Sequence, residues 1–138
     1  NTGGLGTFSS NINLNGADRT IRSNQTSGVF GGGSGTFSGN ITNSSMTVAG
    51  ITKTGVGLHI FSGTNTYNGG TNISAGALLF NTRNSMPASG TVTVADGAIL
   101  GVTVAGSGTT WGSGTGVAGI AGLTSTSNGG EGFGGQTG

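Results

Sequence analysis

Few side chains in this sequence could carry out acid–base or nucleophilic chemistry. His59 is its one histidine, and the three acidic residues, Asp18, Asp96 and Glu131, lie far apart along the chain. A Ser–His–Asp site needs a carboxylate that orients the imidazole. Glycoside hydrolysis needs two carboxyl groups that face one another across the bond to be cleaved. The spacing supports neither arrangement, so we expect no catalytic residues and predict that the protein is not an enzyme.

The surroundings of these residues favour structural roles. In Leu58-His59-Ile60 the alternation typical of a β-strand turns His59 away from its apolar neighbours, so we expect it to face solvent. Asp96 precedes Gly97, and an Asp-Gly pair between apolar runs is a strong turn signal.

Metal and cofactor sites have equally little support. The chain has no cysteine, which excludes disulfides and thiolate ligands. Calcium-binding solenoids need an Asp in each glycine-rich nonapeptide, and residues 129–135 contain none. GxGxxG occurs at 114–119 and 130–135, but such matches arise by chance among 33 glycines and lack a βαβ context. We predict no metal and no cofactor.

Composition also limits the partners. The net charge is +1, and four scattered basic residues cannot neutralise many phosphates, so nucleic acid is an improbable partner. No apolar run approaches the length of a membrane-spanning helix. Tyr67 and Trp111 could stack on surface glycans. Both fall in glycine-rich turns, where an aromatic ring more often covers bare backbone.

The elements that position these side chains are predicted to be β-strands. Strong helix formers are scarce, while short runs of Val, Ile, Leu and Phe alternate with Thr, Ser and Asn. The predicted strands span residues 7–14, 19–23, 28–30, 35–42, 45–48, 57–61, 71–74, 77–80, 91–95, 98–104 and 116–123. The predicted core consists of Phe8, Ile12, Leu14, Ile21, Phe37, Ile41, Met46, Val48, Leu58, Ile60, Ile73, Leu78, Phe80, Val92, Val94, Ile99 and Val102.

An internal repeat favours a solenoid. Gly6-Thr7-Phe8 recurs 29 residues later as Gly35-Thr36-Phe37, and a looser copy, Ile60-Phe61-Ser62, follows 24 residues further on. Repeats of this length are typical of coils stacked on one another. We therefore predict an all-β, parallel β-helix (β-solenoid) of about six coils, with an antiparallel β-sandwich as the alternative. Residues 1–105 would form the solenoid, and the Gly/Ser/Thr-rich tail, 106–138, would be weakly structured or pair with a neighbouring subunit.

The central stretch resembles a known family. Residues 53–57, KTGVG, with 61–71, FSGTNTYNGGT, and 73–78, ISAGAL, look like the autotransporter-associated β-strand repeat, and 90–100 is similar to the segment that commonly follows it. The specific resemblance covers residues 52–100. It implies a right-handed parallel β-helix outside a bacterium, in a type V passenger. In that family the repeat is associated with secretion and folding and carries no enzymatic residues.

The ends of the predicted stack suggest how it functions. Open strand rows are normally covered or charged, but the sequence has no charge before Asp18 and only Glu131 after Asp96. We therefore expect each end to meet another stack. The first hypothesis is a secreted subunit that pairs with itself, head to tail, in an extracellular filament. The alternative is a fragment of a large passenger or adhesin at the cell surface. A polysaccharide-binding or polysaccharide-cleaving β-helix is less favoured.

Overall fold

The computed structural model describes residues 6–23, 34–103 and 123–125, which form short strands joined by turns. The strands are β1 (Gly6–Phe8), β2 (Ile12–Asn13), β3 (Arg19–Arg22), β4 (Gly35–Phe37), β5 (Ile41–Thr42), β6 (Ile51–Thr54), β7 (Leu58–Phe61), β8 (Thr71–Ile73), β9 (Ala77–Phe80), β10 (Val92–Val94), β11 (Ile99–Val102) and β12 (Leu123–Ser125), and a 3-10 helix, η1, spans Arg83–Ser85. Within these ranges, no helix has the length and apolar character needed to cross a membrane.

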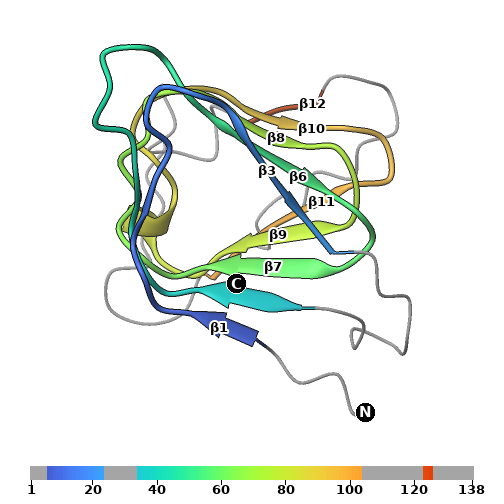
Figure 1. The fold of residues 1–138 in the computed structure, drawn as a ribbon. Helices are drawn as coiled ribbons and strands as arrows, with labels where there is room; N and C mark the ends of the chain where they lie inside the picture. The colour runs from blue at the N-terminus through green and yellow to red at the C-terminus, as the bar shows by residue number, and fades with distance from the viewer. Residues whose placement is uncertain (1–5, 24–33, 104–122, 126–138) are drawn as a thin grey trace.

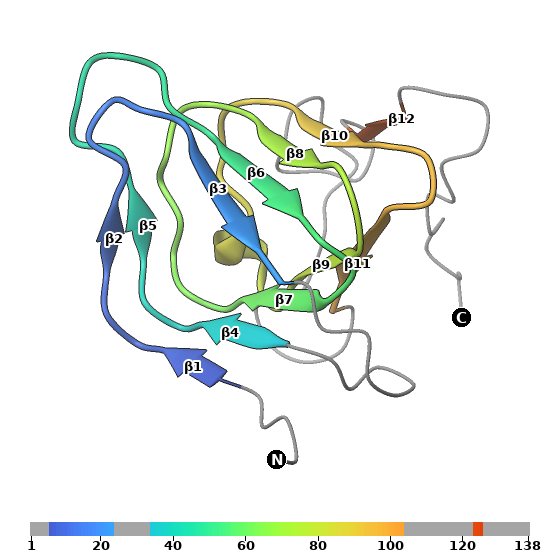
Figure 2. The ribbon, with the colours of Figure 1, turned by 45° about the vertical axis from the view of Figure 1, so that its right-hand side comes forward.

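The strands wind into a parallel β-solenoid (Figure 1). One five-stranded sheet has the order β1-β4-β7-β9-β11, and a second has the order β12-β10-β8-β6-β3. We call these the first and the second sheet. The short β2–β5 pair forms a third side of the coil (Figure 2). Every strand pairing in the described ranges is parallel, which confirms the predicted solenoid and excludes the antiparallel sandwich.

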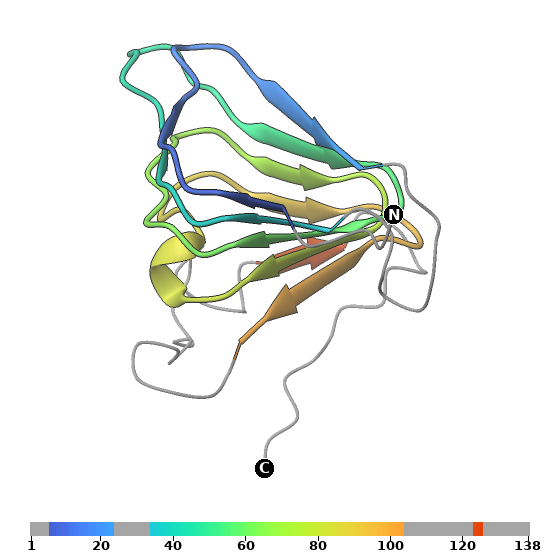
Figure 3. The ribbon, with the colours of Figure 1, turned by 60° about the horizontal axis from the view of Figure 1, so that its bottom comes forward.

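The coils stack in tiers along the solenoid axis (Figure 3). Each of the two larger sheets has five strands, so the described residues make five coils, and the predicted number of about six is not confirmed. Of the predicted tail, 106–138, only β12 lies within the described residues, where it pairs with β10. The predicted strand at 28–30 lies outside them.

The sequence repeat corresponds to the stacking register. Phe8 lies beside Phe37 in the pairing of β1 with β4, and Phe37 lies beside Phe61 in the pairing of β4 with β7. Phe80 of β9 continues the column. The ring centroids of successive residues are 5.1, 5.5 and 5.7 Å apart. Such distances are favourable for aromatic pairs, so the column stabilises the stack along its axis.

Several strand boundaries differ from those predicted. Residues 7–14 form two strands instead of one, because the chain turns a corner between β1 and β2, and residues 35–42 are divided in the same way. Residues 45–48 form no strand. The Asn43 side chain instead holds their loop closed by donating to the carbonyls of Ser45 and Thr47. The sequence pattern does not predict β6, because its Lys53 interrupts the apolar alternation.

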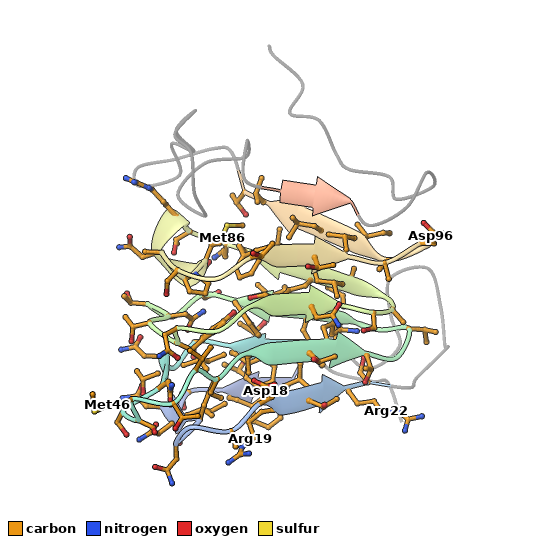
Figure 4. All side chains as sticks on the ribbon, turned by 90° about the horizontal axis from the view of Figure 1, so that it is seen from above. Asp18, Arg19, Arg22, Met46, Met86 and Asp96 are labelled. Atoms are coloured by element: carbon orange, nitrogen blue, oxygen red, sulfur yellow. The ribbon has the colours of Figure 1, made fainter. Side chains whose placement is uncertain are left out.

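Most of the predicted core is confirmed, although six positions are not part of it. Leu14, Phe37, Ile41, Ile73, Leu78, Phe80, Val92 and Val94 are buried, and Ile12, Ile21 and Val102 pack against them. Phe8, Met46, Val48 and Ile99 are exposed instead. Met46 and Val48 lie in the loop before β6, and Figure 4 shows Met46 at the periphery of the molecule. Phe8 is on the terminal strand, where no further coil covers it within the described residues.

Strand β7 accounts for the other two positions, Leu58 and Ile60. The strand is apolar on both faces, and its buried residues are His59 and Phe61, while Leu58 and Ile60 are only partly buried. Phe61 must face inward to join the aromatic column, and strict alternation then takes His59 inward with it. Ile99 lies beside Ala77, which lies beside Leu58, in the same outward register.

Asparagine side chains connect successive coils at the corners. The Asn11 Oδ1 accepts from the backbone N–H of Asn40 at 2.9 Å, and the Asn40 Oδ1 accepts from that of Thr64 at 2.8 Å. The stacked corners come so close that a Cβ at Gly63 would overlap the carbonyl of Gly39. Glycine is therefore required there for the coils to stack.

Candidate functional site

Lys53 is the most unusual side chain in the solenoid. It lies on β6 between Ile21 of β3 and Ile73 of β8, in an inward register, and it is fully buried. Its Nζ donates to the carbonyls of Thr54 at 2.9 Å, Gly55 at 2.7 Å and Ala75 at 3.1 Å. Burial lowers the pKa of Lys53. The sequence shows Lys53 only as one of four scattered basic residues, although Ile51 and Lys53 share one face of β6 by alternation.

His59 does not face solvent, and the prediction made from its neighbours is wrong; only 5% of its surface is exposed. Its ring packs edge-on against Phe37, with centroids 5.4 Å apart, and its Nδ1 is buried without a hydrogen-bond partner among the described residues. Burial, assisted by the positive charge of Lys53, lowers the pKa of His59 to about 4. The imidazole is therefore neutral at pH 7 and almost completely shielded from solvent.

The three acidic residues of the sequence do not come together. Asp18 lies at an exposed corner before β3, where its Oδ1 accepts from the backbone N–H of Gly50 at 2.7 Å. Asp96 lies at an exposed turn after β10, and β6 and β8 separate β10 from β3 (Figure 4). Glu131 lies outside the described residues. The described part of the chain has no group of three or more His, Cys, Asp and Glu residues that could hold a metal ion.

The two aromatic residues considered for glycan stacking do not form such a surface in the described structure. Tyr67 is fully buried, and its hydroxyl bonds to the Thr71 hydroxyl at 2.6 Å. Burial raises the pKa of Tyr67. Tyr67 thus fills the corner of its coil and is closed to ligands. Trp111, together with both GxGxxG matches, lies outside the described residues.

The N-terminal end of the stack is partly apolar and partly charged. Phe8 of the edge strand β1 is 56% exposed, whereas Phe37, Phe61 and Phe80 in the same column are buried. The other edge strand, β3, carries Arg19 and Arg22 (Figure 4). The expected shortage of charge at this end therefore does not hold for β3, whose charged side chains oppose pairing with a further strand.

Fold and buried site together define a parallel β-solenoid with a cation inside its core. Residues 51–80 match the family model of the passenger-associated-transport-repeat. The match runs from β6 to β9 and includes Lys53, His59 and Tyr67. It confirms the resemblance to the autotransporter repeat, points to a passenger-like β-solenoid, and suggests a secreted or cell-surface location. No curated protein and no solved structure gave a significant match to the chain.

Proposed function

We propose that the chain is a non-enzymatic, structural segment of a passenger-like β-solenoid at the bacterial cell exterior. The observation that carries the proposal is the position of the transport repeat, which spans β6 to β9 in the middle of the continuous stack. Three of its polar interior groups, Lys53, Tyr67 and Asn65, are engaged in hydrogen bonds that hold turns and corners. In this proposal the solenoid serves as a rigid scaffold that folds as it is exported.

Two features favour this scaffold over a free subunit that assembles into filaments. The repeat is associated with transport of passengers, and Arg19 and Arg22 on β3 make half of the N-terminal edge unfavourable for pairing with another copy. A further coil of the same polypeptide could place acidic side chains beside these arginines.

An export assay tests the scaffold proposal. The chain would be fused between a signal peptide and a translocator barrel, and its appearance at the cell surface would be followed by cleavage with added protease. Lys53→Met, which removes three hydrogen bonds within the repeat, should reduce the surface yield several-fold. Arg83→Met is the matched control, because Arg83 lies on η1 away from the buried cation, and should leave it unchanged. Equal surface yields for Lys53→Met and the parent chain would contradict the proposal.

A self-assembling extracellular filament is the second candidate. It is favoured by Phe8, whose exposed ring at the end of the aromatic column could continue that column into another copy. Electron microscopy and light scattering of the purified chain over a range of concentrations distinguish the two. Monomers with β-type circular dichroism support the scaffold segment. Long, uniform filaments that Phe8→Asp abolishes would support the second candidate instead.

A further inference from the structure

The outer face of the second sheet carries a groove that the scaffold function does not use. It has a volume of about 470 Å³ and lies where β6, β8 and β10 begin. We call it the sheet groove. Its floor includes backbone of Gly50 and Gly70, and a Cβ at Gly50 would overlap the Gly70 carbonyl. The close stacking of these coils therefore requires a residue without a side chain at Gly50.

A column of polar side chains runs along this groove. Thr52, Asn72 and Thr93 occupy neighbouring positions on β6, β8 and β10. They alternate with the buried residues of those strands, so they lie on the outer face. The spacing between strands places one hydroxyl or amide about every 4.8 Å along the solenoid axis.

These three side chains make no hydrogen bond within the described residues. Several polar side chains elsewhere along the stack are engaged between coils. At the nearby corner, for example, the Asn43 Nδ2 donates to the Asn68 Oδ1 at 2.6 Å. The column of Thr52, Asn72 and Thr93 is therefore a set of donors and acceptors available to a ligand.

The rim of the groove limits what that ligand can be. Asp18 is the charged residue among the lining residues, and its Oδ1 is already bonded to the Gly50 N–H, which leaves Oδ2 to accept from a ligand hydroxyl. Among the described residues no basic side chain lines the groove; Arg19 lies outside it, with its Nη1 donating to the Asp18 carbonyl at 3.3 Å, and the Asp18 carboxylate itself disfavours an anionic ligand. Val48, 66% exposed, provides an apolar wall on which the C–H face of a sugar ring could pack.

We propose that the sheet groove binds a neutral polysaccharide that runs along the solenoid axis. Successive sugar units would exchange hydrogen bonds with Thr52, Asn72 and Thr93, and one unit would donate to Asp18. A peptide fits less well, because the groove lies on the face of a sheet whose backbone groups are already paired. The proposal is independent of whether the solenoid is a passenger segment or a filament.

Affinity gel electrophoresis of the whole chain provides the test. The gels would contain hydroxyethylcellulose, galactomannan or dextran as neutral probes, and alginate as the anionic one. We expect at least one neutral polysaccharide, but not alginate, to retard the chain. The triple variant T52V/N72V/T93V removes the polar groups and keeps residues that favour strands. It should bind at least about tenfold more weakly, since each lost hydrogen bond weakens binding severalfold.

Matched variants separate loss of the ligand contacts from loss of the fold. Thr36→Val makes the same change on β4 of the first sheet and should bind like the parent chain. Asn72→Thr restores a hydroxyl and should bind more tightly than Asn72→Val. Asp18→Asn keeps the oxygen that accepts from the Gly50 N–H. It replaces the triple variant in the binding test if the triple variant loses its circular dichroism signal. The proposal is overturned if no probe retards the chain, if only alginate does, or if the groove variants bind like the parent.

Discussion

The ammonium group of Lys53 and the carbonyl of Ala75, 22 residues apart in sequence, form a 3.1 Å hydrogen bond inside the solenoid. The same Nζ also bonds to the carbonyls of Thr54 and Gly55. One buried cation thus ties the turn after β6 to the turn after β8. The backbone carbonyls of the two turns solvate it in place of water.

Replacing Lys53 should destabilise the protein. Lys53→Met keeps the length of the side chain but leaves buried carbonyls without their donor, which we expect to cost about 1–3 kcal/mol in the free energy of unfolding. Urea unfolding followed by circular dichroism measures the change. Arg83→Met, at an exposed position, should change it by less than about 0.5 kcal/mol. A Lys53→Met chain as stable as the parent would mean that desolvation of the cation cancels its hydrogen bonds.

His59 should make the fold sensitive to acid. Its pKa is about 4 in the folded protein and 6.5 in the unfolded chain, so the unfolded chain binds the proton more readily. Stability should be greatest above pH 6.5 and should decrease as the pH falls from 6.5 to 4. The loss should be roughly 2 kcal/mol, because solvent screening reduces it below the unscreened total, which is ~1.4 kcal/mol for each pKa unit between the two values.

His59→Leu tests this pH dependence, because leucine occupies the neighbouring inward positions, Leu78 and Leu100. The variant should be more stable than the parent at pH 5 and should lose the part of the pH dependence that His59 contributes. Urea midpoints at pH 7.5, 6, 5 and 4 provide the comparison. Parallel curves for the parent and the variant over this range would rule out the assigned role.

The stability lost when a ring is removed from the aromatic column should depend on the position of that ring in the stack. Phe37 lies between Phe8, His59 and Phe61, so Phe37→Ala should cost about 3–4 kcal/mol. Phe8→Ala removes a ring that is already 56% exposed and should cost about 1 kcal/mol. Equal losses in urea unfolding would indicate that Phe8 is covered in solution, as expected if another coil or another copy stacks on it.

The glycine corners should tolerate no side chain. Gly63→Ala would place a Cβ against the Gly39 carbonyl, so the coils would have to separate, and we expect a loss of about 3 kcal/mol or failure to fold. At Gly97, where φ is +73° and a Cβ would have no neighbour within 4 Å, alanine should cost only about 1–2 kcal/mol of backbone strain. Similar urea midpoints for Gly63→Ala and Gly97→Ala would show that neighbouring coils can move apart at Gly63 with little loss of stability.

The sequence was sufficient to predict the parallel solenoid, the register of its repeat and the central repeat family. Stacked coils place equivalent residues beside one another. The recurrence of Gly6-Thr7-Phe8 as Gly35-Thr36-Phe37 therefore predicts which residues of β1 and β4 pair. The looser copy that contains Phe61 predicts the pairing of β4 with β7 in the same way. Burial of Leu14, Ile41 and Ile73 followed from the same alternation.

Only the tertiary structure decided which face of β7 points inward and where the charged groups lie. Local alternation marks two faces but does not say which one is buried when both are apolar, and the stacking of Phe61 on Phe37 settles it for His59. Burial of Lys53 depends in part on the carbonyl of Ala75, 22 residues away, which no local pattern encodes. The sheet groove likewise exists only because three separate coils bring Thr52, Asn72 and Thr93 into one column.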